Sequence, residues 1–250
     1  MINRTLYFGE GLFETFRLYY FNGKLYFPEN IDFHYKRLLK GLKFFNMPSI
    51  SFFNFKKIIK NLFFEKLYSL NDKSSLDSKK IKVFRAKLIV ISLGDKAFFG
   101  KARKLDFILE LDFFKPLNKE IILGISKYKK YSKNPLNFFK TTCYSFNILV
   151  KKEALKKGYY DNIILNEKGE ITETSSSNIY LKIDGKLYTP PIASGILPGS
   201  IRDIFIKRGI AKVKKLYLKD LLKAQDIYIS NAILGFKKAK VNNLKIEAQN

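Results

Sequence analysis

The sequence predicts an α+β protein of two domains, and three observations carry this prediction. Strand-like and helix-like segments cluster along the chain instead of alternating strictly, which favours α+β over a doubly wound fold. The chain has 250 residues, of which 46% are hydrophobic, so it can bury one large core or two smaller ones. A stretch with one proline and a polar end, residues 112–120, separates two groups of elements. We therefore expect a first domain over 1–113, a linker over 114–120 and a second domain over 121–250.

The first domain is expected to begin with a hairpin followed by two helices. Residues 12–20 are rich in aromatic and β-branched types, and Asn22-Gly23 is a strong two-residue turn signal. Apolar residues at helical spacing predict helices over 29–45 and 51–67. The other expected elements are a polar loop over 70–80 and strands near 81–92 and 104–112.

The second domain is expected to open with a strand at Ile121 and a helix near 142–157, which ends at Gly158. Asp184-Gly185 predicts a second tight hairpin turn. The remaining expected elements are strands near 160–166, 177–190 and 226–230, a helix from about 199 to 208, and a short helix or turn over 218–224.

Several classes of function are disfavoured by what the composition lacks. The single cysteine, Cys143, excludes an internal disulfide framework and any multi-cysteine zinc site. The single histidine, His34, lies on a predicted helix beside Arg37, so we expect it to be a packed or surface residue and not the base of a Ser-His-Asp triad. Neither the dinucleotide-binding nor the P-loop glycine motif occurs. We expect no metal site.

The location and charge of the protein can also be predicted. No apolar run reaches the roughly 18 residues of a membrane span, and the N-terminus lacks a signal-peptide pattern, so we expect a cytoplasmic protein that does not enter membranes. The net charge of +25 has two interpretations: binding of nucleic acid, or a lysine-rich, solvated surface. Basic residues are spread evenly along the chain, which favours the second.

Residues 169–203 combine a carboxylate, several hydroxyls and a glycine before a predicted helix start. A lysine amine can form a Schiff base, a buried carboxylate can hold a pyridinium proton, and a helix N-terminus can bind phosphate. Together these parts would hold pyridoxal 5′-phosphate, with Glu173 at the ring nitrogen and Gly199-Ser200-Ile201 at the phosphate. The same residues are also compatible with a polar strand end and an ordinary helix start, and physical reasoning alone leaves both interpretations open.

Five ordered motifs resemble the class IV aminotransferase family, also called the fold-type IV pyridoxal-phosphate enzymes. The resemblance covers essentially the whole chain. The family includes branched-chain aminotransferases, D-amino-acid aminotransferases and 4-amino-4-deoxychorismate lyases. It implies a smaller N-terminal α/β lobe and a larger C-terminal lobe with a mixed, barrel-like sheet. The motifs are GEGLFETFR (9–17), FHYKRL (33–38), FKTTCY (139–144), NEKGEITETSSSNIYLKIDGKLYTPP (166–191) and GILPGSIRD (195–203).

The resemblance implies roles for six residues. Lys140 matches the lysine that carries the cofactor as an internal aldimine, and Glu173 matches the glutamate on the pyridine nitrogen. Arg37 matches the phosphate arginine. The backbone amides of Ser200 and Ile201 match the phosphate cradle at a helix start, although Ile201 replaces a common threonine. Tyr144 matches a position near the cofactor ring.

Within the family, three features favour the lyase branch. They are the length of 250 residues, Thr15 where branched-chain enzymes tend to have glycine, and ISNAILGF (229–236) in place of a hydroxyl-rich segment. The resemblance therefore implies a pyridoxal-phosphate-dependent lyase that converts 4-amino-4-deoxychorismate to 4-aminobenzoate and pyruvate, a step of folate biosynthesis. The substrate carries carboxylates, and Thr15, Arg85 and Asn231 are candidate substrate contacts.

Alternatives remain at this point. A branched-chain aminotransferase with 2-oxoglutarate as acceptor would use the same Lys140 and Glu173. A D-amino-acid aminotransferase is disfavoured because Lys87 occupies the histidine position of its carboxylate trap. A non-enzymatic basic protein would bind nucleic acid, which we do not expect. The family resemblance also implies a homodimer.

Overall fold

The computed structural model describes residues 1–69 and 80–242, so most of the loop predicted over 70–80 lies outside the described residues. The chain divides into two compact units. The N-terminal unit comprises Met1–Pro116 and Phe139–Cys143, and the C-terminal unit comprises Leu117–Phe138 and Tyr144–Asn250. The first passage between the units thus falls inside the predicted linker. Among the described residues, none of the helices is long and apolar enough to span a membrane.

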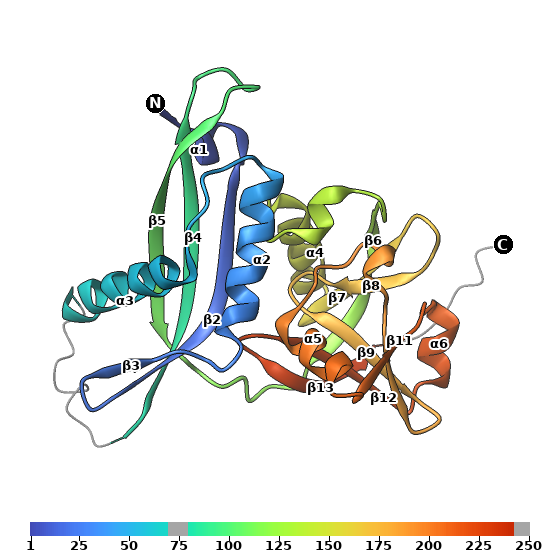
Figure 1. Ribbon diagram of the computed structural model, residues 1–250. Helices are drawn as coiled ribbons and strands as arrows, with labels where there is room; N and C mark the ends of the chain where they lie inside the picture. The colour runs from blue at the N-terminus through green and yellow to red at the C-terminus, as the bar shows by residue number, and fades with distance from the viewer. Residues whose placement is uncertain (70–79, 243–250) are drawn as a thin grey trace. The chain divides into compact units, whose positions relative to one another are not determined.

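The N-terminal unit contains a five-stranded antiparallel sheet in which β4 lies between β2 and β5 (Figure 1). The predicted hairpin is confirmed: Asn22 and Gly23 join β2 to β3 with φ values of 47° and 72°, the left-handed conformations that such a turn requires. The strands are β1 (Ile2–Asn3), β2 (Gly11–Phe21), β3 (Lys24–Tyr26), β4 (Lys82–Gly94) and β5 (Ala102–Phe113).

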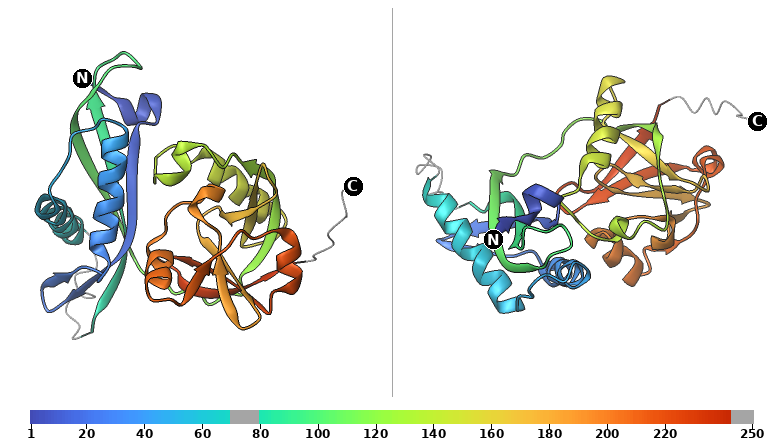
Figure 2. Two further views of the ribbon diagram at one scale, coloured as in Figure 1. Left: turned by 45° about the vertical axis from the view of Figure 1, so that its right-hand side comes forward. Right: turned by 90° about the horizontal axis from the view of Figure 1, so that it is seen from above.

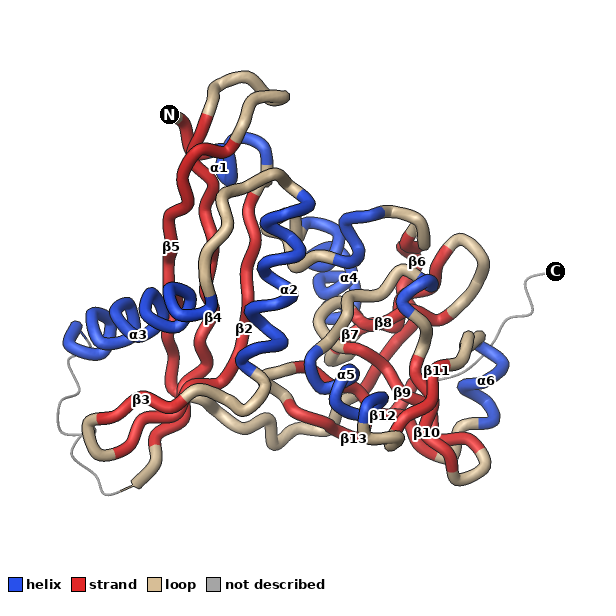
Figure 3. Tube along the Cα trace, viewed as in Figure 1, coloured by secondary structure: helices blue, strands red, loops and turns tan. Residues whose placement is uncertain are grey.

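Helices α2 (Ile31–Phe44) and α3 (Phe52–Ser69) cover one face of this sheet, as the views in Figures 2 and 3 show. The short helix α1 (Arg4–Phe8) precedes β2. Every second residue of β4 is buried, because successive side chains of a strand point to opposite faces. The core between helices and sheet is formed by fully buried apolar side chains, including Phe16, Leu18, Leu42, Phe55, Phe63, Phe84 and Leu88.

The C-terminal unit contains the mixed, barrel-like sheet that the family resemblance implied. Six strands form a closed ring in the order β9-β12-β13-β6-β7-β8, and a pairing of Glu173 with Asn178 joins β8 back to β9. Strands β10 (Lys186–Thr189) and β11 (Ala211–Val213) extend from β9. The ring strands are β6 (Ile122–Lys130), β7 (Asp161–Asn166), β8 (Ile171–Thr174), β9 (Asn178–Ile183), β12 (Asp226–Asn231) and β13 (Gly235–Val241).

The helices of this unit are α4 (Ser145–Lys156), α5 (Ser200–Lys207) and α6 (Leu218–Lys223), with 3₁₀ turns at Pro135–Phe138 and Ile192–Ser194. The predicted turn at Asp184-Gly185 is confirmed, since both residues have positive φ.

One predicted element needs correction. Helix α4 begins at Ser145 and not at residue 142. The preceding backbone pairs with β2: Phe13 N–H donates to the Lys140 carbonyl and Thr142 N–H donates to the Gly11 carbonyl. Because of this pairing, Phe139–Cys143 belongs to the N-terminal unit, although it falls within the predicted second domain.

Candidate active site

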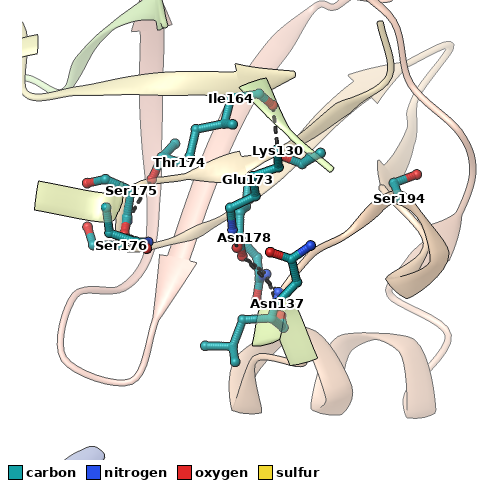
Figure 4. A network of polar contacts seen from close by, with 12 residues as sticks. Lys130, Asn137, Ile164, Glu173, Thr174, Ser175, Ser176, Asn178 and Ser194 are labelled. Atoms are coloured by element: carbon teal, nitrogen blue, oxygen red, sulfur yellow. Dashed lines mark hydrogen bonds and ion pairs between the residues drawn. The ribbon is translucent and has the colours of Figure 1, made fainter. Parts of the chain in front are cut away.

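The C-terminal unit buries the Glu173 carboxylate at the seam where β8 meets β9. Oε1 accepts a hydrogen bond of 2.5 Å from Lys130 Nζ, at the end of β6. Oε2 accepts from the side-chain amide of Asn178 at 3.3 Å and from the backbone N–H of Leu197 at 3.1 Å. Figure 4 shows Lys130, Glu173 and Asn178 converging at this point. Three elements far apart in sequence therefore hold one carboxylate.

The same network leads to the start of α5. Asn178 donates a second hydrogen bond, of 3.0 Å, to the Leu197 carbonyl, two residues before Gly199. A Cβ on Gly199 would come within 1.9 Å of Asn178 Oδ1, so the close approach needs a glycine. Gly199 is the N-cap of α5 and gives no side-chain cap. The first N–H groups of a helix have no acceptor within the helix, so those of Ser200 and Ile201 suit an anion.

The hydroxyl-rich turn between β8 and β9 is held by a buried acid, Asp161 on β7. Its carboxylate accepts hydrogen bonds from the hydroxyls of Ser175 and Ser176 at 2.9 and 3.1 Å. Tyr144 and Asn147 donate from the start of α4 to the carbonyl of Ser175. The predicted cofactor residue Tyr144 thus lies in the C-terminal unit and contacts the turn that follows Glu173.

A second buried acid, Glu170, fastens the segment that precedes α5. Its Oε2 accepts from Ser194 Oγ at 2.7 Å and from Asn166 Nδ2 at 2.9 Å, and Lys215 pairs with Oε1. Burial by itself raises the pKa of Glu170, but these donors outweigh burial and lower it to about 2. Glu170 is therefore a charged structural anchor at neutral pH.

Lys140 is held in the N-terminal unit beside β2. Its backbone pairs with Phe13, and its Nζ lies 4.3 Å from the centre of the Phe13 ring, a cation–π distance. Lys87 Nζ lies 5.3 Å from the same ring. The strand pairing fixes where the Lys140 side chain begins, which is the requirement for a positioned nucleophile.

Arg37 lies on α2 in the same unit and forms a buried cluster with Glu14 and His34. Its Nε and Nη2 donate to the two Glu14 oxygens at 2.7 and 2.5 Å, a bidentate arrangement. His34 Nδ1 lies 2.7 Å from Glu14 Oε2. Burial alone would raise the pKa of Glu14, but Arg37 and His34 lower it to about 2. Of the two expected positions for this histidine, packed or on the surface, the structure shows the first, because His34 is fully buried.

The protonation of His34 follows from this geometry. Burial lowers the pKa of His34, against the opposing effect of Glu14, so the ring is neutral at pH 7. Because the Glu14 carboxylate only accepts, Nδ1 carries the proton, and Nε2 has no hydrogen-bond partner among the described residues. His34 therefore orients Glu14 without adding a charge.

The three candidate substrate contacts lie in different places. Thr15 and Arg85 are on neighbouring strands β2 and β4, where Thr15 pairs with Lys87 and Arg17 with Arg85. Arg85 is partly exposed and pairs with Asp112 at 2.9 Å. Asn231 is at the end of β12 in the other unit. The Asn231 amide donates to Ser177 and Ser176 in the β8–β9 turn and accepts from two backbone N–H groups of its own turn, so it links the two turns.

Among the residues of these networks that were not found from the sequence are Lys130, Asn178 and Glu14. Lys130 is one of 47 lysines and arginines, so composition could not select it. Asn178 and Glu14 stand inside the motifs TETSSSN and FETFR, and a polar residue in an otherwise buried strand was the available signal.

Comparison with known proteins gives the family. The sequence profile of amino-transferase class IV matches residues 11–240. Aminodeoxychorismate lyase of Bacillus subtilis is 29% identical over 244 residues, which covers 91% of this chain and 75% of that protein. Branched-chain-amino-acid aminotransferase of Escherichia coli is 34% identical over 91 residues, but the matched stretch covers only 36% of this chain and 29% of that protein.

Solved structures agree on the fold. The E. coli branched-chain amino acid aminotransferase has a TM-score of 0.79 at 22% identity, over 96% of this chain and 80% of that chain. A Mycobacterium tuberculosis aminotransferase described as hypothetical, in its PLP-bound form, has a TM-score of 0.72 at 16% identity, over 96% of this chain and 84% of that chain. The fold is that of the fold-type IV pyridoxal-phosphate enzymes. The chain belongs to the amino-transferase class IV family.

The residues of the C-terminal unit fit the cofactor of this family, pyridoxal phosphate. A carboxylate offers about four acceptor positions, and Glu173 uses three, so one remains for a ring N–H. The tight approach at Gly199 and the uncapped start of α5 suit a phosphate. When bound, the cofactor supplies an electron sink for a pair of electrons left on a substrate carbon.

Proposed function

We propose that this protein is a pyridoxal-phosphate-dependent lyase that converts 4-amino-4-deoxychorismate to 4-aminobenzoate and pyruvate. The observation that carries the proposal is the extent of the likeness to the B. subtilis aminodeoxychorismate lyase, which spans 91% of the chain. Thr15 and the segment around Asn231 support the same branch. In this proposal Lys140 bonds the cofactor, Glu173 accepts from its ring nitrogen, and Ser200, Ile201 and Arg37 serve its phosphate.

In the proposed lyase reaction, Lys140 carries out the proton transfers. Lys140 would first be freed from the cofactor by the substrate amine; its amine would then remove the proton from the substrate carbon that bears the nitrogen, and the C–O bond to the enolpyruvyl group would break. Pyruvate leaves and the ring becomes aromatic, so the elimination is strongly downhill. The protein therefore contributes mainly orientation and proton handling. Phe13, whose ring lies against Lys140 Nζ, gives that amine an apolar surface on one side.

The substrate carboxylates need cationic or hydroxyl partners, which we assign to Arg85 and Thr15. Arg85 pairs with Asp112 at a partly exposed surface, so it can exchange that partner for a ligand. For Asn231 we propose a supporting role, because its amide nitrogen already bonds Ser177 in the β8–β9 turn and its amide oxygen accepts from Leu234 in its own turn. We also propose a homodimer, by analogy with the family.

The second candidate is a branched-chain aminotransferase. It is favoured by the 34% identity of the 91-residue match to the E. coli enzyme. Such an enzyme would use the same Lys140 but would return a proton to the cofactor carbon and pass the amine to 2-oxoglutarate. The two reactions differ in their need for a keto-acid acceptor.

The test is an acceptor-free assay. Purified protein with added pyridoxal phosphate is given 4-amino-4-deoxychorismate, and pyruvate and 4-aminobenzoate are measured. We expect equimolar release of both, a loss of at least about a thousandfold in Lys140→Ala, and full activity in Lys152→Ala, an exposed lysine of α4. No release from cofactor-loaded protein, together with amine transfer from branched-chain amino acids to 2-oxoglutarate, would establish the second candidate.

A further inference from the structure

Lys130 is a cation that the chemistry described so far does not use. Its side chain is 8% exposed, and its Nζ lies 2.5 Å from Glu173 Oε1, whose side chain is 7% exposed. A buried carboxylate is costly unless a cation or hydrogen-bond donors compensate it. Lys130 therefore already balances the charge of the carboxylate that is assigned to the cofactor's ring nitrogen.

The two oxygens of Glu173 are not held equally. Oε1 has the short, charge-assisted contact with Lys130, whereas Oε2 has two neutral donors at 3.1 and 3.3 Å. Of the two neutral donors, the Leu197 N–H belongs to the segment that leads into α5, and Asn178 belongs to β9. Figure 4 shows the surroundings of the Glu173 carboxylate. A ligand that brings a further hydrogen-bond donor to Glu173 therefore finds Oε2 weakly held, while Oε1 keeps its contact with the Lys130 ammonium.

We propose that Lys130 is a positioning residue that remains the counter-ion of Glu173 and weakens the hold of this carboxylate on a protonated ring nitrogen. This inference rests on the assignment of Glu173 to the cofactor in the proposed function. Two cations on one carboxylate repel each other, so the ammonium of Lys130 opposes a pyridinium on the same group. The ring nitrogen is then moderately and not maximally stabilised in its protonated form.

The test compares two ligands that differ only at the ring nitrogen: pyridoxal phosphate and its analogue with a carbon in that position. The measured quantity is the ratio of their dissociation constants, analogue over cofactor, from titrations followed by absorbance or protein fluorescence. Lys130→Gln keeps a hydrogen-bond donor but removes the charge, and Lys130→Met removes both. We expect either change to raise the ratio about tenfold, equivalent to about 1.4 kcal/mol.

Two control variants test whether the change in the ratio comes from the charge of Lys130 and acts through Glu173. Lys130→Arg retains the cation and is expected to keep the ratio of the unchanged protein. Glu173→Gln is expected to bring the ratio close to one whether or not Lys130 is changed, because the group through which Lys130 acts is gone.

The outcomes are decisive. A ratio that stays the same or falls in both Lys130→Gln and Lys130→Met would overturn the proposal for Lys130. A ratio that is insensitive to Glu173→Gln would instead overturn the assignment of Glu173. Failure of the unchanged protein to bind pyridoxal phosphate would overturn the proposed function itself. Loss of folding would remove binding of both ligands, so it cannot imitate a change in their ratio.

Discussion

The two units each bury a glutamate against a cation, and the two sites are built differently. Glu14 is held by Arg37 and His34, which lie three residues apart on the single helix α2, at 2.5 to 2.7 Å. Glu173 is held by Lys130, Asn178 and the Leu197 N–H, which come from three separate segments at 2.5 to 3.3 Å. Within the described part of the chain each carboxylate accepts at least three hydrogen bonds, so we compare the kinds of donor instead of their number.

The difference lies in which partners can be exchanged. The guanidinium of Arg37 binds both Glu14 oxygens through a rigid, planar set of donors. One oxygen of Glu173 has only neutral donors at longer distances, and the other has a flexible lysine. We infer that the Glu14 cluster is mainly a rigid support for Arg37, whereas Glu173 is arranged to accept a ligand.

The largest expected effect comes from Glu14→Ala. It removes the carboxylate that compensates the buried Arg37 guanidinium, so we expect a loss of about 3–5 kcal/mol in the free energy of unfolding. Urea denaturation followed by circular dichroism measures this loss.

Glu173→Ala is the matched variant in the other unit. Its expected loss is only about 1–3 kcal/mol, because the flexible side chain of a lysine left without its partner can extend towards solvent. An equal or larger loss for Glu173→Ala would remove the proposed distinction between the two sites.

Acid should weaken the Glu14 site progressively. The pKa of Glu14 is lowered from 4.5 to about 2, so its contribution to stability is complete above pH 4.5 and is lost as the pH falls through about 2. At about 1.4 kcal/mol per pKa unit, the full loss is roughly 3–4 kcal/mol. Denaturation curves at pH 5, 4 and 3 measure its onset.

Glu170 in the C-terminal unit has a pKa lowered to about 2 as well, so it adds to the same acid sensitivity. Denaturation curves of Glu170→Gln at the same pH values separate the contribution of Glu170 to this acid sensitivity from that of Glu14. If acid sensitivity vanished in Glu170→Gln, Glu14 would not be the group that titrates.

The sequence predicted local features well because their causes are local. The turns at Asn22-Gly23 and Asp184-Gly185 need left-handed backbone, which these residue types supply. The start of α4 was placed three residues early, because a long-range pairing with β2 takes up the backbone of residues 140–142. The barrel likewise depends on partners far along the chain, as where Lys240 on β13 pairs with Ile122 on β6.

The residues of the candidate site likewise divide into those that local sequence predicted and those that depend on long-range contacts. The helix start at Gly199 and the buried Glu173 were found from the motif around them. Lys130 could not be found, because its role comes only from its 2.5 Å approach to Glu173, 43 residues away in sequence. The role of Arg37 was implied by family resemblance, but its fixation by Glu14 and His34 follows only from the packing of α2 on β2.

The most direct test of the central claim is to find which amine carries the cofactor. The protein is incubated with pyridoxal phosphate, the bond is fixed with sodium borohydride, and peptides are sequenced by mass spectrometry. We predict a stoichiometric pyridoxyl phosphate label on Lys140 that is absent in Lys140→Ala and unchanged in Lys152→Ala. Labelling scattered over many lysines, or specific labelling of a lysine other than Lys140, would contradict the account.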